Sequence, residues 1–75
     1  MRSVLEILKE IQPETVFEEC ESIVDEGILD SFDIVTLIGE LNEEYHINIP
    51  VWEIIPENFN SVKAMEKLVE KQRKK

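Results

Sequence analysis

Apolar residues recur at the spacing of an α-helix in three separate stretches of this 75-residue chain. Residues three and four positions apart lie on one face of a helix, so each stretch presents an apolar stripe that must be buried. The stripes lie within residues 3–12, within residues 31–45, and after Asn60. Because alternating apolar residues occur only in one short segment, the sequence predicts an all-α protein whose helices close on one core.

Capping residues and a proline mark the ends of the first and last helices. Ser3 begins a Ser-x-x-Glu capping box, and Pro13 ends the first helix. Asn60 or Ser61 caps the start of the last helix, whose basic end suits the negative end of the helix dipole. We expect that end, residues 71–75, to be frayed. The predicted core includes Leu8, Ile38, Leu41, Met65 and Leu68.

A long segment without helical periodicity, residues 13–30, separates the first two predicted helices. Its apolar residues come in pairs and Gly27 indicates a turn, so we expect a loop with at most one short helical turn. Loops of this length are uncommon inside compact domains and are often functional. A further short helix is expected near residues 51–56.

The charges of the chain are unevenly distributed. Seventeen Asp and Glu residues against eight Lys and Arg residues give a net charge of −9. Fourteen of the acidic residues, and none of the basic ones, lie between Glu10 and Val62. Such a field repels nucleic acids and anionic membranes and attracts basic protein surfaces, although many acidic surfaces only maintain solubility. We therefore expect no nucleic-acid partner and no insertion into a membrane.

The sequence contains no constellation of residues typical of an enzyme or a metal site. Its one cysteine, Cys20, and one histidine, His46, provide neither zinc-ligand spacing nor a pairing of nucleophile and base. A chain this short forms one thin core and no deep cleft, so we expect a single domain, residues 1–75, without catalysis of its own. No segment resembles a signal peptide or reaches the ~18 apolar residues of a membrane span, which favours a cytoplasmic setting.

The residues best placed for chemistry are Asp30-Ser31-Phe32-Asp33, where the long loop meets the second helix. A serine there is accessible to a modifying enzyme, and a phosphate ester on it faces the free N–H groups of the helix start. On spacing alone, a serine at a helix start is more often only a cap.

The residues around Ser31 favour a functional role for this serine over that of a helix cap alone. The segment Gly27-Ile28-Leu29-Asp30-Ser31-Phe32-Asp33 resembles the attachment motif of acyl and peptidyl carrier proteins, in which Asp-Ser-Leu is central. Here Phe32 replaces the commoner leucine. The similarity continues through Ile34-Val35-Thr36-Leu37 to Tyr45-His46-Ile47-Asn48-Ile49-Pro50, which resembles the aromatic-x-x-x-Ile-Pro close of that family's second helix. It covers about residues 23–69, and no gap is needed between Asp30 and Pro50.

The resemblance implies an acyl-carrier-like bundle of three main helices and one short helix. It also implies that Ser31 carries a 4′-phosphopantetheine arm, taken from coenzyme A by a phosphopantetheinyl transferase, whose thiol holds an acyl or aminoacyl group as a thioester. Asp30 and Phe32 then flank the attachment site, and Val35 and Ile55 lie near the arm. The other implied partners are an acyl- or aminoacyl-activating ligase and a downstream acyltransferase, and we expect a monomer.

A narrower resemblance concerns the cargo. Ile28-Leu29-Asp30-Ser31-Phe32 is similar to the Leu-Leu-Asp-Ser-Phe of D-alanyl carrier proteins of teichoic acid synthesis. Ile49-Pro50-Val51-x-Glu53, followed by Phe59, resembles their third-helix region. Two segments depart from that pattern, since Ile23-Val24 replaces their Leu-Phe and residues 62–65 lack their Pro-Asn-Lys. D-alanine for teichoic acid modification is therefore one candidate cargo among amino acids and fatty acyl groups.

Acidic residues of the second helix form the predicted docking surface for basic partner enzymes, and the alternative is an ordinary solvated face. We expect Trp52 and Phe59 to be packing residues, with contact between Trp52 and a partner as the alternative, and His46 to lie at the helix C-terminus. The docking residues are Asp33, Glu40, Glu43 and Glu44.

The competing hypothesis is an acidic helical interaction module without a prosthetic group, in which Ser31 is only a cap. A carrier requires a hydroxyl group at residue 31, whereas such a module tolerates Asp or Asn there, because both cap well.

Overall fold

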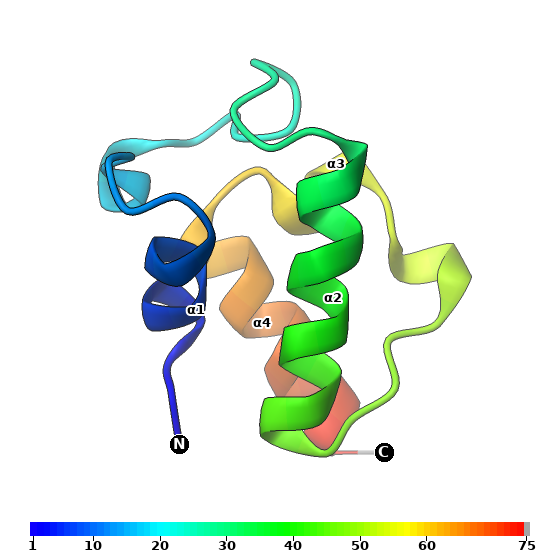
Figure 1. The fold of residues 1–75 in the computed structure, drawn as a ribbon. Helices are drawn as coiled ribbons and strands as arrows, with labels where there is room; N and C mark the ends of the chain where they lie inside the picture. The colour runs from blue at the N-terminus through cyan, green and yellow to red at the C-terminus, as the bar shows by residue number, and fades with distance from the viewer. Residues whose placement is uncertain (75) are drawn as a thin grey trace.

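The computed structural model describes residues 1–74, and that range contains helices and no strand. The all-α prediction is therefore confirmed. Figure 1 shows the long loop crossing from α1 to the start of α2, and η2 standing to the side of α2. In chain order the elements are α1 (Val4–Ile11), the 3₁₀ turn η1 (Phe17–Glu19), α2 (Ser31–Tyr45), the 3₁₀ turn η2 (Val51–Glu53), α3 (Pro56–Phe59) and α4 (Val62–Arg73).

The three longer helices share one core, as their apolar stripes predict. α1 packs against both α2 and α4, α2 packs against α4, and the short α3 packs on α4. Of the predicted core residues only Ile38 is not fully buried, because Leu37 and Leu41 face the interior and Ile38 is turned about 100° around the helix from Leu37. The buried apolar residues are Val4, Ile7, Leu8, Phe17, Ile23, Leu29, Leu37, Leu41, Ile49, Phe59, Met65, Leu68 and Val69.

Side-chain caps fix where the helices begin. The Ser3 hydroxyl accepts a hydrogen bond from the Glu6 N–H at 3.1 Å, and the Glu6 carboxylate accepts one from the Ser3 N–H at 3.1 Å, which completes the predicted capping box. The Ser61 hydroxyl accepts from the Ala64 N–H at 3.1 Å, so Ser61 rather than Asn60 caps α4. α2 ends at Tyr45, and its C-cap, His46, adopts the left-handed conformation with φ of 54°.

Two expectations concern the C-terminal side of the chain. The short helical turn predicted near residues 51–56 is present as η2, whereas α3 was not predicted; it starts at Pro56, where the missing N–H of proline is tolerated and its fixed φ suits the first helical turn. The fraying of residues 71–75 stays a prediction; in the structure α4 continues to Arg73, with Gln72 buried in its apolar stripe. The Arg73 guanidinium lies 5.7 Å from the centroid of the Tyr45 ring. Lys75 is outside the described residues.

Within residues 1–74 no helix combines the length and the apolar character needed to cross a membrane. In the same range no three side chains of His, Cys, Asp or Glu are grouped to hold a metal ion.

Candidate functional site

A tight turn directs the long loop toward the start of α2. The Gly27 N–H donates to the Val24 carbonyl at 3.0 Å and the Ile28 N–H donates to the Ile23 carbonyl at 2.9 Å, the hydrogen-bond pattern of a Schellman motif. Gly27 has φ of +72°, which a residue with a Cβ adopts only with strain. The turn therefore requires glycine at position 27 of the segment that resembles the attachment motif. This turn reverses the chain four residues before Ser31.

The next two residues of that motif also serve the local structure. Leu29 is buried in the core and anchors the end of the loop. Asp30 is extended, and its side chain accepts a hydrogen bond from the Asp33 N–H at 2.8 Å, so Asp30 is the N-cap of α2. The cap hypothesis for Ser31 is therefore wrong, because Ser31 lies one residue inside the helix.

Ser31 itself has no structural partner. It is exposed, and in the part of the chain that the structure describes its hydroxyl group makes no hydrogen bond. The first N–H groups of a helix have no intrahelical acceptor and lie at the positive end of the dipole, so a phosphodiester on this hydroxyl meets donors there. The carboxylates of Asp30 and Asp33 oppose that charge, which means that the helix start alone does not favour a phosphate strongly.

Two exposed apolar side chains lie close to Ser31 on α2, and a third lies on η2. Residues 32, 35, 36, 39 and 43 share the side of α2 that faces away from the core, and we call them the outward face of α2. On this face Phe32 is 78% exposed and Val35 is 69% exposed. Trp52, on η2, is 75% exposed, so the prediction that it packs inside is wrong, whereas Phe59 is buried as expected. Phe32 and Val35 are three residues apart and are therefore neighbours on the helix surface, and contiguous exposed apolar side chains are typical of surfaces that contact a partner.

A small apolar cavity of about 220 Å³ lies between α2, α3 and the long loop. Ile34, one helical turn after Ser31, and Ile55 are both on its wall, and the expectation that Ile55 lies near the arm stays a prediction. Its full lining is Val24, Ile34, Ile54, Ile55, Pro56 and Phe59.

The predicted docking acids differ in their exposure to solvent and in whether a basic side chain pairs with them. Glu43 is exposed on the outward face of α2, and Asp33 is half-buried. Glu40 and Glu44 do not face solvent freely, because the Arg2 guanidinium donates to Glu40 at 2.8 Å and to Glu44 at 2.6 Å. The hydrogen bond from Arg2 lowers the pKa of the Glu44 carboxyl group, and the hydrogen bonds to Glu40 and Glu44 raise the pKa of Arg2 further above its usual value.

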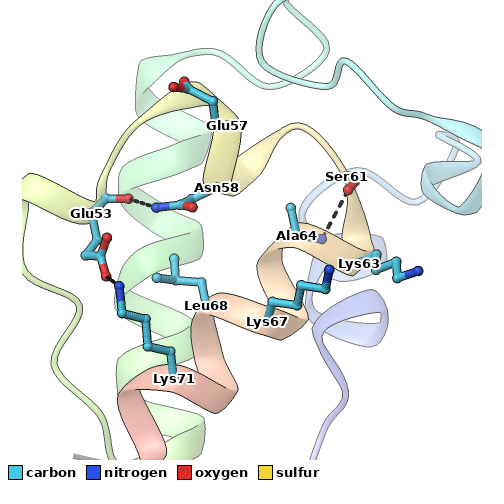
Figure 2. Close-up of a pocket in the computed structure, with 9 residues that line it drawn as sticks. All are labelled: Glu53, Glu57, Asn58, Ser61, Lys63, Ala64, Lys67, Leu68 and Lys71. Carbon is cyan, nitrogen blue, oxygen red and sulfur yellow. Dashed lines mark hydrogen bonds and ion pairs between the residues drawn. The ribbon is translucent and has the colours of Figure 1, made fainter.

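A second and larger groove, of about 370 Å³, runs between α3 and α4 (Figure 2). Its wall carries charged side chains, with Lys71 paired to Glu53 at 2.6 Å and the Asn58 amide donating to the Glu53 carbonyl at 2.7 Å. No residue of α2 or of the long loop lines this groove, so it is separate from the surroundings of Ser31.

Two side chains that the sequence analysis did not assign to the site hold the long loop in place. The Asn60 side chain hydrogen-bonds residues 24 and 25 of the turn, and the Gln12 side chain hydrogen-bonds both the Ile28 carbonyl and Asp33. Their partners are 16 to 36 residues away in the chain, so no local pattern could have indicated them.

Comparison with curated proteins gives significant similarity to carriers of two kinds. The chain is 39% identical over 72 residues to aminoacyl carrier protein 2 of Bradyrhizobium diazoefficiens, a match that covers 92% of this chain and 73% of that protein. It is 38% identical over 60 residues to the D-alanyl carrier protein of Streptococcus suis, covering 79% of this chain and 76% of that protein. Aminoacyl carrier protein 1 of the same Bradyrhizobium is 45% identical over 47 residues, or 63% of this chain and 51% of that protein. No protein-family model matches the chain, and no solved structure matches it significantly.

Proposed function

The chain belongs to the family of aminoacyl and D-alanyl carrier proteins, and we propose that it carries its cargo on a 4′-phosphopantetheine arm attached to Ser31. As a carrier protein it is not an enzyme, and separate partner enzymes perform the chemistry. When bound, the arm supplies a thiol that holds the cargo as a thioester.

Attachment of the arm needs only one group from this chain, the Ser31 hydroxyl. In the transferase reaction its oxygen forms a bond to the phosphorus that bears the pantetheine group of coenzyme A. The phosphorus–oxygen bond of the pyrophosphate breaks, adenosine 3′,5′-bisphosphate leaves with that electron pair, and the serine proton passes to a base. An exposed hydroxyl without a hydrogen bond is ready for this step, since no internal partner must be broken first.

One observation carries the proposal: Asp30 caps α2, and this leaves the neighbouring Ser31 hydroxyl unused by the fold. A serine that merely capped the helix would accept a hydrogen bond from the third N–H of the first turn, as Ser61 does in α4. The protein contains both arrangements: Ser61 caps α4, and Ser31, whose hydroxyl is free, lies within the motif that resembles the carrier attachment site.

We expect the transferase and the cargo-activating ligase to dock on the outward face of α2. Its exposed Phe32 and Val35 offer an apolar contact beside Ser31, and Glu43 on the same face, with the half-buried Asp33 beside that face on α2, offers negative charge to a basic partner. Glu40 and Glu44 contribute less than the sequence predicts, because Arg2 already neutralises them in part.

The decisive experiment is intact-mass measurement after incubation with coenzyme A and a phosphopantetheinyl transferase of broad specificity. The wild type should gain one phosphopantetheine, Ser31→Ala should gain none while remaining helical, and Ser61→Ala should be modified like the wild type. Modification of Ser31→Ala, or a folded wild type that no transferase modifies, would favour the acidic interaction module instead.

We further propose an amino acid as the cargo, because the relatives of both kinds are named for aminoacyl or D-alanyl groups. The cavity beside Ile34 supports a small cargo, since its volume is only about 220 Å³. The test is to incubate the phosphopantetheine-bearing protein with ATP and a D-alanine ligase of the D-alanyl carrier system, or with an amino-acid ligase of the aminoacyl carrier system. A mass gain that hydroxylamine removes identifies the thioester, and the reaction that produces it identifies the cargo. If only fatty acyl groups are accepted, the amino-acid proposal is wrong.

A further inference from the structure

The turn that precedes Ser31 is held by one carboxamide side chain that is distant from it in the sequence but contacts it in the fold. The Asn60 side-chain oxygen accepts hydrogen bonds from the N–H groups of Val24 at 2.9 Å and Asp25 at 3.1 Å. Its side-chain nitrogen donates to the Asp25 carboxylate at 3.1 Å. The Asn60 carbonyl accepts a fourth hydrogen bond, from the Ile23 N–H at 2.9 Å. One residue between α3 and α4 thus fixes three consecutive residues of the loop.

A second carboxamide holds the other end of the same segment. The side-chain nitrogen of Gln12, the residue that ends α1, donates to the Ile28 carbonyl at 2.7 Å and to the Asp33 carboxylate at 3.0 Å. Its side-chain oxygen accepts from the Thr15 hydroxyl at 2.9 Å, which orients the amide. Gln12 therefore contacts the chain on both sides of Ser31, three residues before it and two residues after it.

Neutral amides are suited to this segment for an electrostatic reason. Residues 21–33 include Glu21, Asp25, Glu26, Asp30 and Asp33 and contain no basic residue. Like charges at such spacing repel one another, and an irregular loop also has backbone groups that need partners. A carboxamide offers a donor and an acceptor without adding charge, so it can satisfy both backbone N–H groups and a carboxylate at once.

We propose that Asn60 and Gln12 are positioning residues, which hold residues 23–33 so that the Ser31 hydroxyl is presented to the transferase in one fixed orientation. The inference rests on the proposed attachment of phosphopantetheine at Ser31. Neither residue contacts Ser31, and both act through the loop and the first turn of α2.

The chain allows a charge-exchange test of this proposal. Asn60→Asp removes the donor to Asp25 and places two carboxylates where a hydrogen bond of 3.1 Å existed. Adding Asp25→Asn to Asn60→Asp restores one amide facing one carboxylate, with the donor on the opposite side. The matched control is Asn58→Asp, which adds the same charge two residues away and removes a side-chain donor, but whose partner is the Glu53 carbonyl rather than the loop.

The measured quantities are kcat and KM for phosphopantetheine transfer, with hydrogen exchange of the Val24 and Asp25 amides. Misplacing a reacting group by about 1 Å can reduce a rate on the order of 100-fold, so Asn60→Asp should lower kcat about tenfold or more. KM should change little, because the outward face of α2 is intact. Global destabilisation instead lowers the concentration of folded substrate, which raises the apparent KM and leaves kcat unchanged. The double exchange should restore kcat and amide protection, and Asn58→Asp should behave like the wild type.

Three results would overturn the proposal. The first is an unchanged kcat in Asn60→Asp when the Val24 and Asp25 amides have lost their protection. The second is a double exchange that regains this protection but not kcat. Gln12→Ala provides the independent variant if Asn60→Asp does not fold, and an unchanged kcat in a folded Gln12→Ala is the third. Failure of the wild type to accept phosphopantetheine is a different result, because it removes the proposed function itself.

Discussion

Replacing Gly39 by alanine should stabilise this protein. Gly39 lies in the middle of α2, is exposed, and has ordinary helical geometry rather than a positive φ. A Cβ atom built on it meets no other atom within 4 Å, so alanine fits without displacing a neighbour. The helix-propensity difference between glycine and alanine should therefore appear in full, as a gain of about 0.5–1 kcal/mol in the free energy of unfolding.

The assay is urea denaturation followed by circular dichroism at 222 nm, supported by a thermal scan. For a domain of this size, a gain of about 0.5–1 kcal/mol corresponds to a rise in Tm of roughly 2–8 °C. An unchanged m-value would show that the substitution changed the free energy of unfolding and not the compactness of the unfolded state.

Gly27→Ala provides the control with the opposite sign. Its Cβ also meets no atom within 4 Å, but the residue has φ of +72°, so the cost comes from the backbone alone. We expect a loss of about 1–2 kcal/mol, the usual cost of the left-handed conformation for a residue with a Cβ. If both variants change stability in the same direction, the argument from backbone geometry is wrong.

Three further measurements test the core, the caps and the Arg2 cluster. Leu41→Ala should lower the free energy of unfolding by about 2–5 kcal/mol, since Leu41 is fully buried; a loss below that range in urea denaturation would place it outside the core. Ser61→Ala should cost about 0.5–2 kcal/mol because Ser61 caps α4, whereas Ser31→Ala should cost almost nothing, so equal losses would contradict the assigned caps. Arg2 lowers the pKa of Glu44 in the folded state, so the stability from this pair is present above the ordinary pKa of about 4.3 and is lost as the pH falls. Arg2→Gln should therefore flatten the decline in stability below about pH 5, and an unchanged pH profile would refute this.

The elements best predicted from sequence are those whose signals are local. α2 spans residues 31–45 as expected, because an acidic cap and a helical apolar stripe specify the same start. The capping box at Ser3 was equally predictable, since its two partners, Ser3 and Glu6, lie within four residues of sequence. The error at Pro56 has a local cause too, because a proline that stops one helix can equally occupy the first position of the next.

The contacts that the sequence did not predict join distant parts of the chain. Arg2 binds Glu40 and Glu44 across 38 and 42 residues, which partly neutralises two of the four predicted docking acids. Asn60 hydrogen-bonds Asp25 and Val24, which are 35 and 36 residues away in the chain. The sequence therefore indicated Asn60 only as a possible helix cap. Long-range polar contacts of this kind follow from the packing of the helices. The apolar stripes of a single sequence indicate which helix faces are buried, but not which polar side chains then come into contact.

Some residues around Ser31 are not explained by folding, and they share one surface. The hydroxyl group of Ser31 makes no hydrogen bond among the described residues, and Phe32 and Val35 remain exposed on a helix that has other apolar residues for the core. Gly39 weakens the same helix although nothing in residues 1–74 occupies the space beside it. In a protein that otherwise follows local rules, such departures are expected where function requires them. A partner that covers Phe32 and Val35 and approaches the backbone at Gly39 accounts for all four residues. Gly39→Ala should then slow docking of the transferase or the ligase even as it stabilises the carrier.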